Sequence, residues 1–432
     1  MNDIQTWESL LAAFVPLFNA PSFVIFIQIA SAWVLCPGRR TITRLYALAE
    51  PLQSKAHDAY HRFIREADWH AVHLWKIVAK LMVTALYETG VICMDLDDTT
   101  FHKSGRKIEG AAWWRDAVRS TGTKVVHCFG LNVIVLTLRV NPLWGGEPLG
   151  LPINLRIHLK GGATLLVLAE EMIRETVSWF PGRCFEVCGD GFYASLMGKV
   201  FPPDVQLTSR MRRDAALYEM PPQKRPHTPG APRKKGKRLP TPEAMALQIR
   251  NRQWKEETVV LRGKEKKRLV WSRTVLWYKV NPQFAVLLVI CRDPAGKEPD
   301  DFFCTTDANQ SARHVVESYA GRWSIEDTFK NTKQSLGAET PQSWKKFGPE
   351  RIAHIAFLLY SLVWLWYLQS QGAKRTWKIV PWYPQKQNAS FTDALASLRK
   401  MLWRKRIISM TGKSSVPSKI ITTLIDVVAA AA

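Results

Sequence analysis

The fold is decided by one stretch, which reads Val91-Ile92-Cys93-Met94-Asp95-Leu96-Asp97-Asp98-Thr99-Thr100. Its first half is the short apolar run of a buried strand, and its second half is acidic. Uncompensated charge at the end of a buried strand is costly, so such a strand seldom ends in carboxylates that have no use. The stretch therefore predicts a strand that carries acids to the edge of a sheet, although Asp-Thr pairs also occur in ordinary turns and caps.

A second short strand of the same kind is expected in Arg183–Tyr193, which reads RCFEVCGDGFY. It ends at Asp190-Gly191, which is also a common turn pair. Two strand-end carboxylates and one further acid would make an oxygen cage for Mg²⁺ or Mn²⁺. Between the two acidic strands, the pattern predicts strands over 123–140 and 150–159 and a helix over 163–180.

A third segment, residues 311–336, is expected to be one helix carrying Tyr319, Arg322, Glu326 and Lys333. At ~100° per residue these four side chains fall within an arc of about 60°. A carboxylate flanked by two cations and a phenol suits a group that binds metal while its neighbours hold phosphate. A solvated helix face with Arg322 and Glu326 as an i,i+4 pair explains the same spacing.

Taken in order, the three segments resemble a known family. D-x-T after a strand, a later strand with D-G-x-Y, and then Y-x2-R-x3-E-x6-K are similar to the bacterial insertion-sequence DDE transposases with the YREK signature, the insertion sequence 4-like superfamily. The resemblance covers about residues 88–345. It implies an α/β (α+β) fold with a ribonuclease H-like catalytic domain, a β-rich insertion, two Mg²⁺ or Mn²⁺ ions, and cut-and-paste movement of DNA.

The resemblance implies a role for each motif residue. The first catalytic, metal-binding acid would be Asp97, with Asp98 as an alternative because Asp98-Thr99-Thr100 also fits D-x-T. Asp190 and Glu326 would be the second and third acids. Asp95 alternates with Asp97 along the strand and would share its face.

The DNA contacts implied by the resemblance involve further residues. Tyr319, Arg322 and Lys333 would bind phosphate. Within the insertion, Arg210 belongs to a basic run, and Trp277 (or Trp271) is a candidate for stacking on a flipped base. A core or surface role is the alternative for either tryptophan.

The composition favours a nucleic-acid partner. The 432 residues include 60 Lys plus Arg against 37 Asp plus Glu, a formal net charge of +23. Such an excess suits a polyanion, and a membrane surface is the alternative. Because the charge is spread along the chain, we expect a long DNA track and no membrane. The resemblance implies that terminal inverted repeats and target DNA are the partners.

Three further patterns bear on location. The start Met1-Asn2-Asp3-Ile4 lacks a basic region typical of a signal peptide. The apolar run Ile352–Leu368 is shorter than the ~20 residues of a span, so a buried helix is expected. The seven cysteines are scattered and predicted to be reduced core residues. We therefore expect a cytoplasmic bacterial protein that joins the nucleoid when bound to DNA.

The expected organisation has four parts: 1–87, helical and DNA-binding; 88–207 with 301–345, catalytic; 208–300, a basic loop and β-rich insertion; and 346–432, helical. Residues 39–45 (RRTITRL) suit either a helix-turn-helix contact with DNA or a solvated basic turn. Residues 221–242 are expected to be a mobile basic loop. Residues 398–406 suit contact with DNA or with a second protomer, since a homodimer is expected in the synaptic complex.

Three functions remain open on this sequence. The first is a transposase that cuts at the element's ends and joins the 3′-hydroxyl ends to target DNA. The second is a metal-dependent nuclease of the same fold without strand transfer. The third is a catalytically inactive DNA-binding protein whose acids only stabilise turns.

Overall fold

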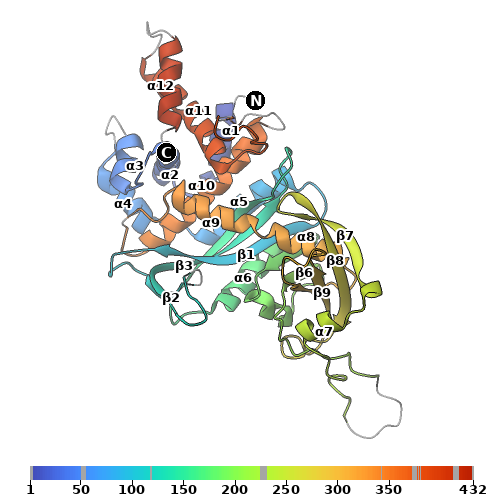
Figure 1. Ribbon diagram of the computed structural model, residues 1–432. Coiled ribbons are helices and arrows are strands. Elements are labelled where there is room, and N and C mark those ends of the chain that lie inside the picture. Colours follow the sequence, from blue (N-terminus) through green and yellow to red (C-terminus); the bar gives the residue numbers. More distant parts are fainter. Residues whose placement is uncertain are drawn as a thin grey trace.

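The structure is a computed structural model (Figure 1). It describes residues 3–49, 55–116, 119–223, 231–341, 343–371, 377, 379, 381–411 and 418–430. Part of the expected basic loop, residues 224–230, lies outside the described residues.

Strands make up the centre of the molecule. They are β1 (Ile92–His102), β2 (Ala112–Arg115), β3 (His127–Val140), β4 (Leu149–His158), β5 (Phe185–Gly189), β6 (Val205–Arg210), β7 (Lys255–Leu261), β8 (Lys264–Val275), β9 (Val286–Arg292) and β10 (Asp301–Thr305). They form one ten-stranded mixed sheet in the order β2-β3-β1-β5-β6-β10-β9-β8-β7, with β4 also paired to β3. β1 is antiparallel to β3 and parallel to β5, and β5 is parallel to β6.

Helices precede, interrupt and follow the strands. They are α1 (Asp3–Ala12), α2 (Ala20–Leu35), α3 (Ile42–Ala49), α4 (His57–Arg65), α5 (Ala71–Leu86), α6 (Leu165–Ser178), α7 (Pro242–Gln248), α8 (Ala312–Gly321), α9 (Ser324–Gln334), α10 (Gly348–Gln371), α11 (Phe391–Thr411) and α12 (Ser418–Ala430), with 3₁₀ turns η1 (Val15–Leu17), η2 (Tyr193–Gly198) and η3 (Asn251–Gln253). The helical character expected of both ends of the chain is confirmed. Helices α5, α9 and α10 lie on one side of the β1–β3–β4 region, and α6 lies on the other (Figure 1).

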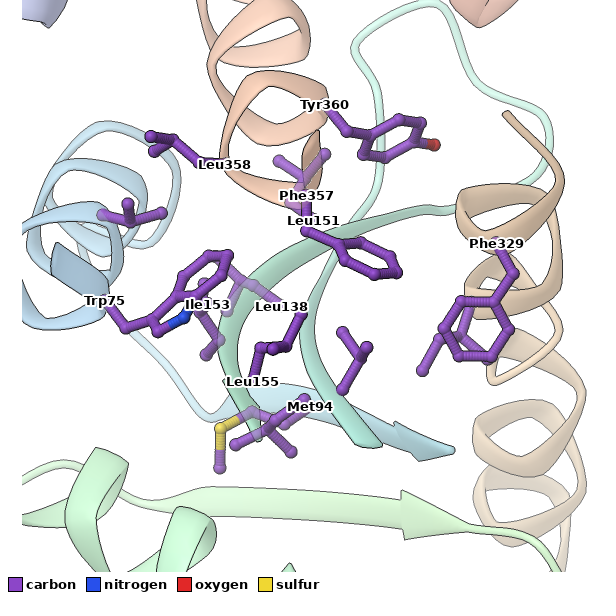
Figure 2. Close-up of a cluster of buried hydrophobic side chains, with 14 of the residues drawn as sticks. Trp75, Met94, Leu138, Leu151, Ile153, Leu155, Phe329, Phe357, Leu358 and Tyr360 are labelled. Atoms are coloured by element: carbon purple, nitrogen blue, oxygen red, sulfur yellow. The ribbon is translucent and has the colours of Figure 1, made fainter. Parts of the chain in front are cut away.

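The main core lies between these helices and the sheet. Figure 2 shows Trp75 of α5, Phe329 of α9 and Phe357 of α10 gathered around the apolar side chains of β3 and β4. Phe357 stacks on Phe101 of β1, with ring centroids 5.5 Å apart. Burying each large apolar side chain stabilises the folded state by about 1.5–3 kcal/mol relative to leaving it exposed. The core therefore fixes α9, which carries Glu326, against the strand that carries Asp97.

Helix α10 confirms the expectation of a buried apolar helix. It is long and apolar enough to cross a membrane, and 94% of its most apolar window is buried inside the protein. Its backbone also continues past the predicted limits at both ends. Buried aromatic residues such as Trp364 and Tyr360 explain its apolar composition as core packing.

Two local predictions were wrong. The acids do not end a strand, because β1 continues to His102 and stays paired with β3 from Met94 to His102. Residues 311–336 are not one helix, because α8 ends at Gly321 and α9 begins at Ser324. At the joint the backbone hydrogen bonds span three residues instead of the four of an α-helix. Trp323 N donates to Ala320 O, and Glu326 N donates to Trp323 O. Gly321 lies against the Arg139 guanidinium, where a Cβ atom would stand 3.0 Å from Nη1.

The insertion is part of the central sheet. Its strands β7, β8 and β9 follow β10 in the same hydrogen-bonded order, and helix α8 packs on all three of them. A separate small core forms there around Val259, Val289 and Val315. The boundaries at 208 and 300 stay a prediction, since the sheet crosses both without a break.

Within the basic segment 39–45, Arg40 is held inside the protein. The backbone N of Arg40 donates to Thr340, and its buried guanidinium donates to Ser335 O, just past α9. Arg40 therefore fastens the N-terminal helices to α9 and is not available to DNA. Arg39 and Arg44 are exposed.

The cysteines are free, as predicted, and most of them lie in the core. Cys36, Cys188, Cys291 and Cys304 are buried, whereas Cys184 is exposed. Cys93 and Cys128 are half-buried.

Candidate active site

Strand β1 and the α8–α9 joint meet at one ion pair. Asp97 lies in the middle of β1, and Arg322 is the residue that follows α8. Arg322 Nη1 donates to Asp97 Oδ2 over 2.6 Å, with only 7% and 18% of the two side chains exposed. Two motifs that are 225 residues apart in sequence are thus joined by a charge-assisted hydrogen bond.

The second acid, Asp190, follows β5, which is the parallel neighbour of β1. Its Oδ1 accepts hydrogen bonds from Phe192 N at 2.9 Å and Tyr193 N at 3.3 Å, so the carboxylate also closes the turn. Asp190 is close enough to Asp97 to raise the pKa of that side chain. The structure therefore brings the first two acids together.

Asp98, the alternative first acid, faces the other side of the sheet. Its carboxylate accepts from Tyr193 Oη and from Asn132 Nδ2, both at 2.9 Å. Burial and the neighbouring carboxylate of Asp98 raise the pKa of Tyr193, so the phenol stays a donor. Alternation along β1 thus separates Asp97, which faces Arg322, from Asp98, which is held by two neutral donors.

The electrostatics at Asp97 suit a cation. Burial raises the pKa of Asp97 to about 7; the Arg322 guanidinium opposes this, and Asp190 and Asp98 add to it. Arg322 Nε is buried and has no hydrogen-bond partner among the described residues. Carboxylate oxygens close together are the donor set that Mg²⁺ and Mn²⁺ prefer. The residues present therefore fit a hard divalent ion.

The third acid is less closely placed. Glu326 lies in the first turn of α9, four residues after Arg322, and its side chain is exposed. Within the described ranges, the oxygens of Asp97, Asp190 and Glu326 do not all lie within 4.8 Å of one another.

A buried polar network holds the joint in place. Asp95, two residues before Asp97, forms an ion pair with Arg139 of β3 in which the Asp95 side chain is fully buried. Arg139 Nη1 donates to Ser318 Oγ at 3.1 Å, and Ser324 Oγ donates to Asp95 Oδ2 at 3.4 Å. The network therefore contacts the last turn of α8 and the first residue of α9, and fixes Arg322 and Glu326 between them.

A basic cleft of about 650 Å³ opens beside Arg322. Its lining includes Tyr319, Trp323 and five basic residues of the insertion: Arg210, Arg262, Lys264, Lys266 and Arg268. The Arg262 guanidinium lies over the Trp323 ring, 3.9 Å from its centroid.

The cations of this cleft differ in how they are paired. Arg210 is paired with Asp301 at 2.6 Å, and Arg268 with Asp293 at 3.0 Å. Arg262 and Lys264 have no carboxylate partner in the part of the chain that the structure describes, so their charge faces the cleft.

Of the expected phosphate contacts, Tyr319 lies at this cleft and Lys333 does not line it. Burial raises the pKa of Tyr319, so its hydroxyl remains a donor. Lys333 Nζ donates to Thr100 O at 2.9 Å. Thr100 is three residues past Asp97, which is about 10 Å along a strand.

Trp277 does not fit the base-stacking role. Its side chain is 6% exposed and belongs to the main core. A ring packed on both faces has no free surface for a base, so that prediction is corrected. Trp271 is half-buried and packs against the same core.

Several residues of the site carried no signal in the sequence. Arg139 and Asn132 lie in an apolar strand, and their partners Asp95 and Asp98 become apparent only through the pairing of β1 with β3. Tyr193 does belong to the D-G-x-Y pattern, and its contact with Asp98 gives that tyrosine a structural reason.

The comparison with known proteins bears on this site. Residues 26–139 match the sequence model of a family described as DDE superfamily endonuclease. The match includes β1 with Asp97 and ends in β3, so Asp190 and Glu326 lie outside it. A search of curated proteins found no match. Over residues 26–139 the chain is therefore similar to DDE superfamily endonucleases.

Proposed function

We propose that this protein is a DDE-type DNA transposase of the YREK kind. It would cut at the ends of an insertion sequence and join the 3′-hydroxyl ends to target DNA. The observation that carries the proposal is the Asp97–Arg322 pair, because it brings the D-x-T strand and the Y-x2-R-x3-E segment to one place beside a basic cleft.

The strand order supports a ribonuclease H-like catalytic domain. Strands β4, β3 and β1 form an antiparallel set, and β5 and β6 extend it in parallel. Acids at β1 and after β5 then lie on neighbouring strands, and the third acid arrives on a late helix. The β-rich insertion between Asp190 and Glu326 extends the same sheet.

The proposed site consists of Asp97, Asp190 and Glu326, which would hold two Mg²⁺ or Mn²⁺ ions. When bound, such ions activate water or a 3′-hydroxyl for in-line attack and stabilise the leaving oxygen. Arg322 has a planar guanidinium suited to two-point contact with a backbone phosphate. Tyr319 would donate a hydrogen bond to phosphate. Lys333, which contacts β1 farther along the strand, would bind another phosphate of the DNA.

DNA would enter along the basic cleft. Arg262 and Lys264, at the β7–β8 turn, supply charge that no carboxylate neutralises in the described structure. Arg210 would join them by exchanging Asp301 for a phosphate. Neutralising several phosphates releases counterions, so the affinity for DNA should fall steeply with salt.

A nuclease that cuts without joining is the second candidate, and the family description favours it because it names an endonuclease. The two are separated by incubating pre-cut element ends with a supercoiled target plasmid. Covalent joined products support the transposase, and cutting without joined products supports the nuclease. Homodimer formation on paired ends and a cytoplasmic, nucleoid-associated location belong to the same proposal.

The first experiment measures cutting of a plasmid that carries the native flanks of the coding region, with Mg²⁺ and with EDTA. We expect metal-dependent cleavage that Asp190→Asn abolishes. Asp307→Asn is the matched control, because Asp307 Oδ1 also caps a turn after a strand, accepting from Asn309 N at 2.9 Å. Binding without cutting in any metal would leave the third possibility, an inactive DNA-binding protein.

A further inference from the structure

The far end of β1 carries a second group of ligand-type side chains. His102 ends β1, Asp116 directly follows β2, and Cys128 lies on β3. One nitrogen of His102, the Cys128 sulfur and one oxygen of Asp116 all lie within 4.8 Å of one another. Within the described ranges, no other three His, Cys, Asp or Glu side chains are grouped so closely.

The sheet register explains why these three meet. His102 is paired with Gly130, and Cys128 is paired with Trp114. Side chains two residues apart on a strand share a face, so His102 lies diagonally opposite Cys128, with Asp116 two residues beyond Trp114. By the same alternation His102 faces away from Asp97, five residues earlier, so this group is separate from the carboxylate site.

The donor set points to a particular ion. Imidazole, thiolate and carboxylate together suit Zn²⁺, whereas Mg²⁺ and Mn²⁺ prefer oxygen alone. Zn²⁺ bonds of about 2.0–2.3 Å require ligand atoms about 3–4 Å apart, which small side-chain movements would reach. His102 is exposed, and its ring makes no hydrogen bond among the described residues, so an ion has a way in.

We propose that His102, Asp116 and Cys128 bind one Zn²⁺ ion, with water in the fourth position. The ion would fasten β2 to the ends of β1 and β3, next to the segment that binds Lys333. The inference does not depend on DNA cleavage or on the three proposed catalytic acids.

Neighbouring groups set limits on the affinity. Arg119 Nε lies 3.5 Å from Asp116 Oδ2, and the Lys333 ammonium acts electrostatically on both Asp116 and Cys128. These cations oppose a second positive charge. The thiolate must therefore supply much of the binding, which favours Zn²⁺ strongly over Mg²⁺.

The test is a Co²⁺ titration of the full-length protein after removal of bound metal. A Co²⁺–thiolate bond gives a near-ultraviolet charge-transfer band, which Zn²⁺ should displace. We expect the thiolate band of the wild type to follow binding of one Co²⁺ ion, whatever further Co²⁺ the carboxylates take up. We expect loss of the band in Cys128→Ser and at least a tenfold weaker affinity for Zn²⁺ at this site in His102→Gln.

The controls alter residues outside the proposed ligand set. His127→Gln should keep the band, since His127 adjoins Cys128 but points to the other face. Cys184→Ser, at an exposed cysteine, should also keep it. Asp97→Asn with Asp190→Asn should leave the band intact, because those carboxylates belong to the other site.

A second measurement, the melting temperature with and without Zn²⁺, distinguishes loss of the metal site from misfolding of a variant. With the carboxylate site disabled by Asp97→Asn and Asp190→Asn, Zn²⁺ should raise the melting temperature of the protein and of its His127→Gln variant, because a ligand of the folded state stabilises it. In the same background Zn²⁺ should leave the melting temperature of Cys128→Ser unchanged. Absence of a band in the wild type, or a band that persists in both Cys128→Ser and His102→Gln, would overturn the proposal. Neither result would affect the cleavage proposal, since both readouts report binding alone.

Discussion

Arg322 Nη1 lies 2.6 Å from Asp97 Oδ2, and this pair joins the middle of β1 to the joint between α8 and α9. The pairing does two things at once. It offsets the charge of Asp97, which lies near Asp190 and Asp98, and it holds in place an arginine that lines the basic cleft.

Replacing Arg322 should therefore slow cleavage by more than the loss of its positive charge would by itself. We expect Arg322→Ala to lower the single-turnover cleavage rate by about 10²-fold or more, the size of effect seen when a charged transition-state contact is lost. Arg322→Lys should recover little, because an ammonium cannot reproduce the two-point geometry. Full recovery by lysine would show that only the charge matters.

The Asp95–Arg139 pair should act on stability. Asp95 is fully buried, so Asp95→Asn leaves the Arg139 guanidinium without its counter-charge, a change that costs about 3–5 kcal/mol. Urea unfolding measures the loss. Asp214→Asn, in the exposed Arg212–Asp214 pair, is the control and should change stability little. Equal effects at the two positions would contradict the role given to burial.

The Glu186–His314 pair, whose atoms lie 2.8 Å apart, should make stability depend on pH. The hydrogen bond to Glu186 raises the pKa of His314 above 6.5, so the contribution of His314 is fully present below pH 6.5 and is lost as pH rises through the raised value. For Glu186, burial opposes ionisation, but hydrogen bonds from His314 and Ser318 outweigh it and lower the pKa below 4.5. Its contribution is present above pH 4.5 and is lost as pH falls through the lowered value.

The stabilisation from this pair is therefore largest between pH 4.5 and 6.5. His314→Gln should cost about 1 kcal/mol or less in that window, because half of the imidazole is in solvent, and still less at pH 8.5. Urea unfolding of the variant and the wild type at both pH values checks this. A loss that grows with pH would refute the pairing.

The raised pKa of Asp97, about 7, predicts pH-dependent metal binding. A carboxylate must lose its proton to bind a cation, so the affinity for Mn²⁺ should rise with pH and level off above about 7. Calorimetric titration with Mn²⁺ from pH 5.5 to 8.5 tests this. In Asp98→Asn the affinity for Mn²⁺ should still level off at high pH, because Asp98 faces Tyr193 and Asn132. An affinity for Mn²⁺ that does not depend on pH would contradict the assignment of Asp97 as a metal ligand.

Much of this arrangement follows from local sequence. Apolar runs located β1, β3, β4 and β5 to within a few residues, and the acidic motifs singled out Asp97 and Asp190. These features depend on periodicity and on residue type, which one sequence displays directly.

The remainder depends on contacts between distant segments. The end of β1 is set by pairing with β3, and the break at Gly321 by the approach of Arg139, which lies about 180 residues earlier. Trp277 could not be assigned to the core or to DNA from its neighbours in sequence, because its burial depends on segments that only the fold brings together. Arg40 looked like a DNA contact because its partners at the end of α9 are 295 or more residues away.

The central claim is that Asp97, Asp190 and Glu326 act as one metal-dependent site, and Glu326 is its least constrained member. The most direct measurement is the single-turnover cleavage rate of Glu326→Gln in Mg²⁺, beside the wild type and Glu171→Gln, which alters an exposed helical glutamate on α6. We predict that Glu326→Gln lowers the rate by at least about 10³-fold while DNA affinity in EDTA stays unchanged, because the loss is in metal binding and transition-state charge. Cleavage by Glu326→Gln at the wild-type rate would contradict the account.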